Sequence, residues 1–194
     1  MSSKSTFERI ALLTALAPLG CGRLLYEPRF DAGPVDVGLT ADARLLDAPT
    51  PCAFDPGAVG VGACPSACTG GCAGGVCTVA CDASSACAAD DIVCPAAWPC
   101  VVSCGGSMSC AATMVDASDA SSLDMRCRGS ESCVADTITC PTTGSCNLAC
   151  TGAVTCTSST LACGEGGCAA SCGSAAAFMH ECGMSRCCAQ ACGG

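Results

Sequence analysis

Basic and aromatic residues are scarce in this sequence. Only 3% of the 194 residues are aromatic, there is no lysine after Lys4, and the only lysines or arginines after residue 51 are Arg126, Arg128 and Arg186. The formal net charge is −9. Nucleic acids and anionic lipid surfaces bind proteins through many positively charged side chains. We therefore exclude nucleic acid as a partner and expect no membrane binding through a basic face.

Large apolar side chains are also few, so the chain has few residues with which to form a conventional hydrophobic core. Residues classed as hydrophobic make up 51% of the chain, but much of that fraction is alanine and cysteine. The chain holds 25 cysteines and 23 glycines. Cysteine at this density is typical of a scaffold held by disulfides or metal ions. Covalent cross-links are the usual supplement where apolar burial cannot offset chain entropy.

The cysteine spacings of common metal sites are missing. Zinc and copper thiolate sites usually contain C-x-C or C-x2-C pairs with histidines nearby. This chain has neither spacing, and its single histidine is His180. We expect His180 to lie in an exposed loop, and we assign no metal ligand and no cofactor. A metal-thiolate buffer remains an alternative function.

The N-terminal residues resemble an export signal. Lys4 and Arg9 precede a ten-residue apolar run over residues 10–19, which is too short to span a bilayer. We therefore expect residues 1–20 to be a signal peptide. Residues 21–51 are rich in proline and aspartate, and their only cysteine is Cys21 at the boundary. This composition predicts a disordered tether.

The remaining residues, 52–194, form a cysteine-rich domain with an internal repeat of 23 residues. Successive cysteines are separated by 4, 6, 7 and 6 residues, and four series of positions recur at this period. One repeat has Ala117 and Leu123 where two cysteines are expected, without loss of register. Regular repeats of this length are typical of solenoids.

Short β-like segments recur at fixed positions within each repeat and are separated by Gly, Ser and Pro turn signals. Examples are Ile92-Val93, Ile138-Thr139 and Leu161-Ala162, each followed at once by a cysteine. No stretch of the domain has a sustained helical periodicity. The sequence predicts an all-β parallel solenoid with turns of about 23 residues, three short strands per turn, five to six turns and little helix. Tandem small disulfide knots remain a second possible fold.

Two pairing schemes fit the cysteines. Ala117 and Leu123 are lost together, which favours bridges between cysteines six residues apart, such as Cys81–Cys87 and Cys94–Cys100. The competing scheme pairs C-x3-C cysteines, as in Cys77–Cys81. The candidate disulfide cysteines are Cys81, Cys87, Cys94, Cys100, Cys104, Cys110, Cys127, Cys133, Cys140, Cys146, Cys150, Cys156, Cys163 and Cys168.

The segment Leu19-Gly20-Cys21-Gly22 resembles the bacterial lipobox, although Pro18 stands where that motif usually has leucine. The resemblance implies that Cys21 is lipidated. Together with the acidic tether and the cysteine repeat, it makes nearly the whole chain similar to a set of cysteine-rich surface lipoproteins predicted in myxobacteria and related bacteria. That similarity implies an outer-membrane, cell-surface or periplasmic location and assigns no activity.

The run Cys150-Thr-Gly-Ala-Val-Thr-Cys156 also resembles the coils of insect antifreeze β-helices. Ice binding in that family needs Thr-x-Thr stacked turn upon turn. Thr137 and Thr139 form one such pair, but the neighbouring turns have Met114 and Asp116 or Thr160 and Ala162. We therefore expect no ice binding.

No residue set has the pattern of a catalytic site. A hydrolase triad would need His180 as its base, and no nucleophile-elbow motif surrounds any serine. Paired acids occur at Asp90-Asp91 and at Asp116, Asp119 and Asp124, where solvated turns are the simpler interpretation. Our hypothesis is a non-enzymatic, exported surface protein, lipid-anchored in a membrane, with an extracellular protein or glycan as its ligand. An extracellular hydrolase acting on polysaccharide or peptide is the alternative enzyme.

Overall fold

The computed structural model describes residues 53–173 and 179–192. The chain divides into two compact units, Met1–Ala43 and Arg44–Gly194, and the described residues all belong to the second. The expected signal peptide, the expected tether and Cys21 lie outside the described residues.

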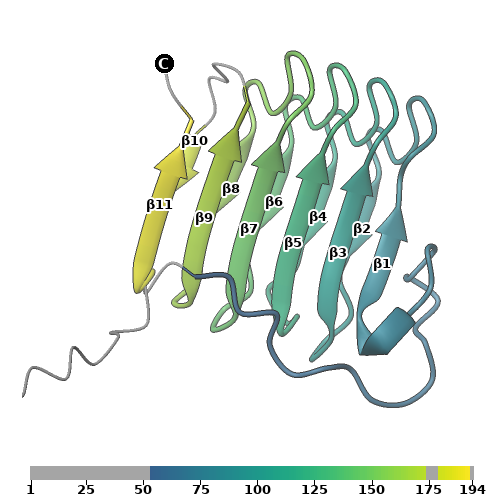
Figure 1. The fold of residues 1–194 in the computed structure, drawn as a ribbon, viewed down its shortest axis with the longest axis vertical. Helices are drawn as coiled ribbons and strands as arrows, with labels where there is room; N and C mark the ends of the chain where they lie inside the picture. The colour runs from purple at the N-terminus through teal and green to yellow at the C-terminus, as the bar shows by residue number, and fades with distance from the viewer. Residues whose placement is uncertain (1–52, 174–178, 193–194) are drawn as a thin grey trace, which may run out of the picture. The chain divides into compact units, whose positions relative to one another are not determined.

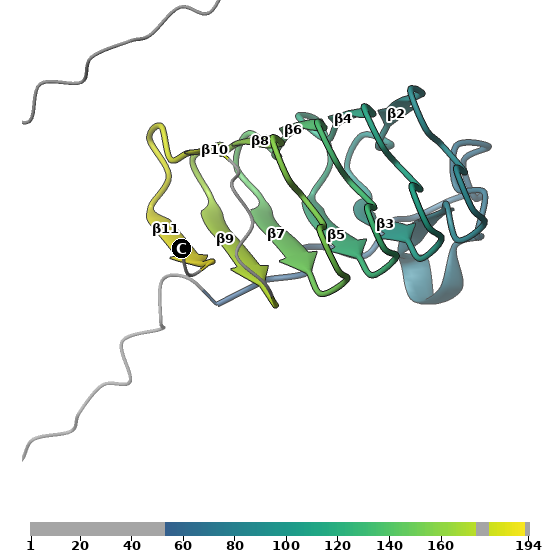
Figure 2. The ribbon, with the colours of Figure 1, turned by 90° about the horizontal axis from the view of Figure 1, so that it is seen from above.

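The described residues form a parallel β-solenoid with two sheets facing each other (Figures 1 and 2). The six strands of sheet A are β1 (Cys77–Ala80), β3 (Pro99–Cys104), β5 (Ser122–Cys127), β7 (Ser145–Cys150), β9 (Gly167–Cys172) and β11 (Cys187–Ala191). The five strands of sheet B are β2 (Asp91–Val93), β4 (Met114–Asp116), β6 (Thr137–Thr139), β8 (Thr160–Ala162) and β10 (Met179–Glu181). One 3-10 helix, η1 (Ala73–Gly75), precedes β1.

The register of the strands reproduces the 23-residue repeat. In sheet A, Cys104 pairs with Cys127 and Cys127 with Cys150, each 23 residues further on. The step shortens to 22 residues between Cys150 and Cys172, because the loop between β8 and β9 is one residue shorter. For residues 53–173 and 179–192, the structure thus confirms the all-β solenoid, its period and the near absence of helix.

Each turn contains two strands rather than the three that the sequence predicted. The third side of the coil consists of turns, in which every second residue has a left-handed backbone, as at Ser85, Cys87 and Ala89. These turns occupy residues 84–89, 107–112, 130–135 and 153–158. A strand needs a negative φ at every residue, so this side cannot be β-structure. Backbone hydrogen bonds still connect the successive turns on this side. For example, Ser85 N–H donates to Ser107 O at 2.9 Å.

Each sheet contributes a single layer of side chains to the interior. Sheet A contributes a column that includes Val102, Met125 and Leu148, and sheet B contributes one that includes Val115 and Ile138. Each such side chain contributes on the order of 1.5–3 kcal/mol when fully buried. Cysteines account for 14 of the 27 buried hydrophobic residues, so disulfides supply much of the rest of the interior.

The N-terminal end of the stack is covered by its own cap. Thr78 and Gly71 form an antiparallel bridge, and Ala80 N–H donates to Thr69 Oγ1 at 2.9 Å. These contacts satisfy the outer backbone groups of β1, which an exposed edge strand would leave free for another chain.

Residues 53–60 form an extended segment that we call the strap. It crosses the starts of the sheet A strands from β9 towards β1 (Figure 1). Successive turns of the solenoid follow one another in the opposite direction, from β1 towards β11. Ser145, Ser122 and Gly75 hold it by hydrogen bonds to Asp55, Pro56 and Gly60. Among the described residues, no helix is long and apolar enough to cross a membrane.

Candidate functional site

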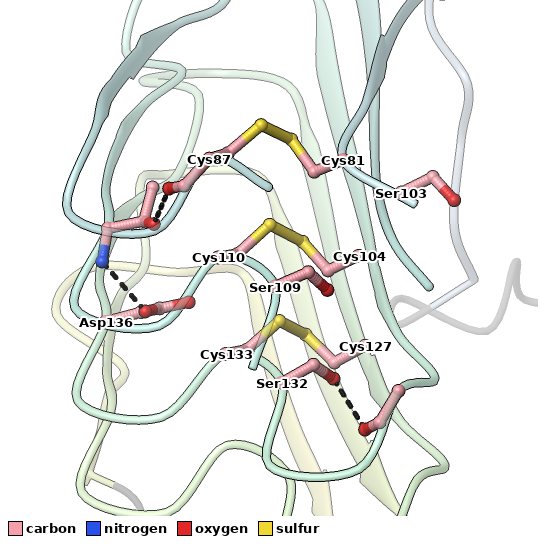
Figure 3. Close-up of a disulfide and its surroundings, with 12 residues drawn as sticks. Cys81, Cys87, Ser103, Cys104, Ser109, Cys110, Cys127, Ser132, Cys133 and Asp136 are labelled. Carbon is pink, nitrogen blue, oxygen red and sulfur yellow. Dashed lines mark hydrogen bonds between the residues drawn. A yellow bond between two sulfur atoms is a disulfide. The ribbon is translucent and has the colours of Figure 1, made fainter. Parts of the chain in front are cut away.

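Four disulfides are stacked turn upon turn inside the solenoid, at the corner between sheet A and the third side. Figure 3 shows the first three of them. In each, a cysteine at or next to the end of a sheet A strand is bonded to the cysteine six residues later, with Cα–Cα distances of 5.7–6.1 Å. The bonds are Cys81–Cys87, Cys104–Cys110, Cys127–Cys133 and Cys150–Cys156. This column replaces a hydrophobic core at that corner.

A second column connects the end of sheet B with the start of sheet A. It consists of Cys94–Cys100, Cys140–Cys146, Cys163–Cys168 and Cys182–Cys188. In the turn between the first two bonds, Ala117 and Leu123 take the cysteine positions, and both are fully buried. Apolar packing therefore fills the one gap in the column.

The pairing across six residues is the one found, and the competing C-x3-C pairing is wrong. Cys77 bonds to Cys68 and Cys100 bonds to Cys94, so neither is bonded to the cysteine four residues later. The C-x3-C scheme fails because the cysteines it pairs begin and end one segment of sheet A, where the extended backbone holds them apart. The ends of the solenoid add Cys64–Cys72 and Cys172–Cys192, and Cys187 is disulfide-bonded as well.

The disulfides of the first column hold a costly backbone in place. Cys87, Cys110, Cys133 and Cys156 have φ values of 53–56°. A left-handed backbone costs a residue with a side chain roughly 1–2 kcal/mol. The covalent bond and the hydrogen bonds between turns stabilise this conformation, which sequence reasoning missed because such a φ leaves no mark on residues other than glycine.

Groups of sulfur atoms come close enough together to suggest metal sites, but their chemistry does not fit. The groups are Cys64, Cys68 and Cys72; Cys104, Cys110 and Cys133; Cys140, Cys146 and Cys168; and Cys163, His180 and Cys188. All of these cysteines are in disulfides. A cysteine binds zinc or copper as a thiolate, so none of these groups offers a thiolate set in this oxidised form.

His180 is a half-buried residue of β10, so its expected place in an exposed loop is wrong. It pairs with Leu161 in the column of sheet B that faces the interior. Its Nε2 lies 3.1 Å from Cys163 Sγ and 3.4 Å from Cys188 Sγ. Burial lowers the pKa of His180, and a side-chain hydrogen bond with Gln190 partly opposes this effect. Leu161 and His180 are 19 residues apart rather than 23, which hid this alignment from the sequence.

The acidic residues of the hydrolase alternative are dispersed. Asp91 begins β2 and His180 is in β10, and these strands are at opposite edges of sheet B. Asp116 is exposed on sheet B, whereas Asp124 is on sheet A. No acid–histidine pair forms among these residues, so the geometry gives the enzyme hypothesis no support.

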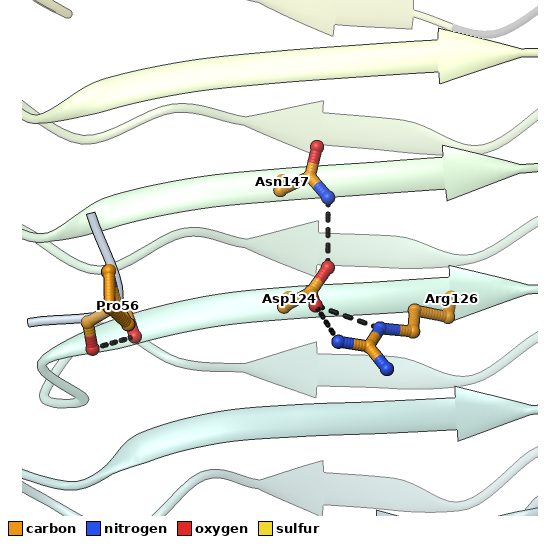
Figure 4. Close-up of polar contacts among 5 residues, drawn as sticks. Pro56, Asp124, Arg126 and Asn147 are labelled. Atoms are coloured by element: carbon orange, nitrogen blue, oxygen red, sulfur yellow. Dashed lines mark hydrogen bonds and ion pairs between the residues drawn. The ribbon is translucent and has the colours of Figure 1, made fainter. Parts of the chain in front are cut away.

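Asp124 instead belongs to a polar group on the outer face of sheet A (Figure 4). Its Oδ2 is 2.5 Å from Arg126 Nη2, and its Oδ1 accepts a hydrogen bond of 2.8 Å from Asn147 Nδ2 on the next strand. Both carboxylate oxygens are therefore occupied. The ion pair and this hydrogen bond account for the place of Asp124 in the fold.

Asp136 is the most unusual acid of the described residues, and sequence reasoning did not single it out. It is 1% exposed and precedes β6, at the position that Thr113 and Ser159 occupy in the neighbouring turns. Its Oδ1 accepts from Thr113 N–H at 3.0 Å, while its Oδ2 is buried without a hydrogen-bond partner. Burial raises the pKa of Asp136 to about 7, against hydrogen bonds from the Thr113 and Ala112 backbone that lower it.

The hydroxyls at the neighbouring positions show what this site requires. Thr113 Oγ1 donates to Cys87 O at 2.5 Å, and Ser159 Oγ donates to Cys133 O at 2.6 Å. Each of these two hydroxyls therefore donates to a backbone carbonyl oxygen. A protonated Asp136 also has a hydrogen to donate, whereas a carboxylate has none.

Comparisons with known proteins add no relative: no family model, curated protein or solved structure matches this chain.

Proposed function

We propose that this protein is an exported, lipid-anchored surface protein without enzymatic activity, and that its solenoid displays a recognition surface for an extracellular protein or glycan. The observation that carries the proposal is the interior built from disulfides. Structural disulfides form and persist in oxidising compartments outside the cytoplasm. A chain whose core combines a few large apolar side chains with stacked disulfides depends on such a compartment to fold.

The outer face of sheet B supports a recognition role. At one position of its strands it carries Asp91, Met114, Thr137, Thr160 and Met179 in register. Met114 and Met179 are each about 60% exposed. The face thus mixes acidic, apolar and hydroxyl groups and does not repeat one side chain. A varied surface on a rigid frame suits a specific ligand, because little conformational entropy is lost on binding.

The lipid anchor is the part of the proposal that comes from Cys21 and its lipobox-like surroundings. Two acyl chains or more hold a protein stably at a membrane, because each buried methylene contributes about 0.8 kcal/mol. The acidic, proline-rich residues 21–51 would act as the spacer between that anchor and the solenoid.

Two measurements on the protein produced in a bacterial host test the proposal. Radiolabelled palmitate is expected to label the wild type and not Cys21→Ser, and the variant is expected in the soluble exported fraction with an unchanged circular dichroism spectrum. The denatured, unreduced protein is expected to have almost no free thiols. Absence of label, or twenty or more free thiols with bound metal, would overturn the proposal, and the second result would favour the metal buffer.

A further inference from the structure

His180 lies among the sulfur atoms of two neighbouring disulfides, Cys163–Cys168 and Cys182–Cys188. Its Nε2 is 3.1 Å from Cys163 Sγ, 3.4 Å from Cys168 Sγ and 3.4 Å from Cys188 Sγ. These four residues belong to the last two turns: Cys163 follows β8, Cys168 is in β9, His180 is in β10 and Cys188 is in β11. One ring nitrogen therefore has three sulfur atoms around it at the C-terminal end of the stack.

The distances around Nε2 are close to those of a tetrahedral zinc site. Zinc lies about 2.3 Å from a thiolate sulfur and about 2.0–2.1 Å from an imidazole nitrogen, so two such ligand atoms are about 3.5 Å apart. Three thiolates and one imidazole are a common ligand set of structural zinc. Only the bond between Cys163 and Cys168 has to open, because two sulfur ligands of one zinc ion are about 3.8 Å apart.

Both disulfides at His180 are open to a reductant, unlike the middle bonds of the first column. Cys182 is exposed and Cys163 is half-buried, whereas both cysteines of the Cys104 and Cys127 bonds are fully buried. Thiol–disulfide exchange requires that an attacking thiolate reach a sulfur atom. We therefore expect a dithiol to reduce the bonds at His180 before it reduces those inside the stack.

An imidazole distinguishes this group from the other groups of close sulfur atoms. His180 is the single histidine of the chain. The group at the N-terminal cap, for example, consists of Cys64, Cys68 and Cys72 alone. The side chain of His180 also forms a hydrogen bond with Gln190. Contacts of this kind orient the ring of a histidine that binds a metal.

We propose that reduction of the two disulfides creates a zinc site, in which the thiolates of Cys163, Cys168 and Cys188 and Nε2 of His180 bind one Zn²⁺. Each disulfide takes two electrons and two protons from a dithiol, such as that of a protein disulfide reductase, which becomes a disulfide. Zinc then displaces the protons of the three ligating thiols, and Cys182 remains a thiol. The metal replaces two covalent links between the sheets, so the last turns stay joined when these bonds open.

Zinc binding by the full chain before and after mild reduction tests the proposal. The oxidised protein is expected to bind no zinc. After treatment with a water-soluble phosphine and gel filtration, it is expected to bind about one Zn²⁺ per chain. Cobalt in place of zinc is expected to give the absorption of a tetrahedral ion bound by thiolates. No zinc uptake after reduction, or equal uptake without reduction, would overturn the proposal.

Alkylation followed by mass spectrometry identifies the ligands. In the reduced wild type, zinc is expected to protect Cys163, Cys168 and Cys188 from alkylation and to leave Cys182 reactive. This pattern also separates a single site from a metal buffer, in which most cysteines would be protected together. Protection of a different set of cysteines would place the metal elsewhere and overturn the assignment.

His180→Ala and a matched control separate this site from zinc bound by loose thiols. His180→Ala keeps every cysteine and should lower the zinc affinity of the reduced protein by at least about 100-fold, because loss of even a residue that orients a ligand costs about 10–100-fold. The control Cys64→Ser/Cys72→Ser removes the bond at the other end of the stack and should bind zinc as wild type does. Circular dichroism of the oxidised variants checks that they fold alike. Equal affinities of wild type and His180→Ala would show that His180 is not a ligand.

Discussion

The backbone N–H of Thr113 donates a hydrogen bond of 3.0 Å to Oδ1 of Asp136, which lies one turn further along the stack. Both residues are almost fully buried, and the second carboxylate oxygen of Asp136 has no hydrogen-bond partner. A buried oxygen of this kind is far less costly when it carries a proton. Asp136 is therefore a buried group whose charge depends on pH near neutrality.

The first prediction concerns the pH dependence of stability. The pKa of Asp136 is about 7 in the folded protein and about 3.8 as a reference for the unfolded chain. Between these values the folded state holds a proton that the unfolded state has released. The free energy of unfolding should thus fall as pH rises from about 4 to 7, by up to about 1.4 kcal/mol per pH unit, and then level off. Guanidinium unfolding of the oxidised protein at a series of pH values measures this slope.

Asp136→Asn removes the titrating group and keeps an oxygen that can accept from Thr113. The variant should be more stable than wild type at pH 8 and close to wild type at pH 4. Its free energy of unfolding should therefore change less between these two pH values. The exposed Asp119 is the matched control, and Asp119→Asn should keep the wild-type slope. The lowered pKa of His180 works against the Asp136 slope in both proteins, so the comparison between them is decisive, and an unchanged slope in Asp136→Asn would contradict the assignment.

The second prediction restores the missing bond. The double variant Ala117→Cys/Leu123→Cys should form a disulfide, because both positions are buried and the equivalent cysteines in the neighbouring turns are bonded. Closing so short a loop contributes about 2 kcal/mol, partly offset by the lost packing of Leu123. Thiol counting and unfolding midpoints with and without reductant measure the bond and its effect. Leu123→Cys alone should be less stable than wild type, and two reactive thiols in the double variant would contradict the prediction.

The third prediction concerns the left-handed residues of the third side. Ala135 is exposed with a φ of 60°, which costs alanine roughly 1–2 kcal/mol and glycine nothing. Glycine also adds chain entropy to the unfolded state, worth about 0.4–1 kcal/mol. Ala135→Gly should therefore raise the free energy of unfolding by about 0.5 kcal/mol.

The exposed Ala153, one turn further on, provides the control because its φ is not positive. Ala153→Gly should lower stability by about 0.5–1 kcal/mol, since only the entropic cost remains. Thermal or guanidinium unfolding of the two variants side by side checks the opposite signs. Equal losses in both would show that Ala135 is not strained.

The fourth prediction uses Trp98, the single tryptophan of the chain, as a reporter of the strap. A Cβ at Gly60 would lie 2.1 Å from the Trp98 ring, and the ring is 9% exposed. Gly60→Ala should thus displace the strap and shift the tryptophan emission to longer wavelength. Val61→Ala, at a side chain that is 85% exposed, should leave the emission unchanged. An unshifted spectrum in Gly60→Ala would place the strap elsewhere.

The disulfide pairing was accessible from the sequence because it is a local relation. Cysteines six residues apart can meet at a corner of a coil with this period. One repeat has Ala117 and Leu123 in place of two cysteines, and this joint replacement indicated which cysteines are bonded to each other. The ends of the solenoid were harder to predict, because Cys68, Cys172 and Cys192 bond across 9 and 20 residues. These sequence separations differ from the six residues of the repeat, so the repeat could not predict them.

By itself, the sequence determined the solenoid, its 23-residue period and the reliance on sulfur, because each of these follows from spacing and composition. Only the tertiary structure decided that one side of the coil is left-handed turns, that the strap runs against the stack, and that Asp136 is enclosed. The physical reason is that backbone handedness, a contact between Asp55 and Ser145, and the burial of one carboxyl each depend on neighbouring turns 23 or 90 residues away along the chain.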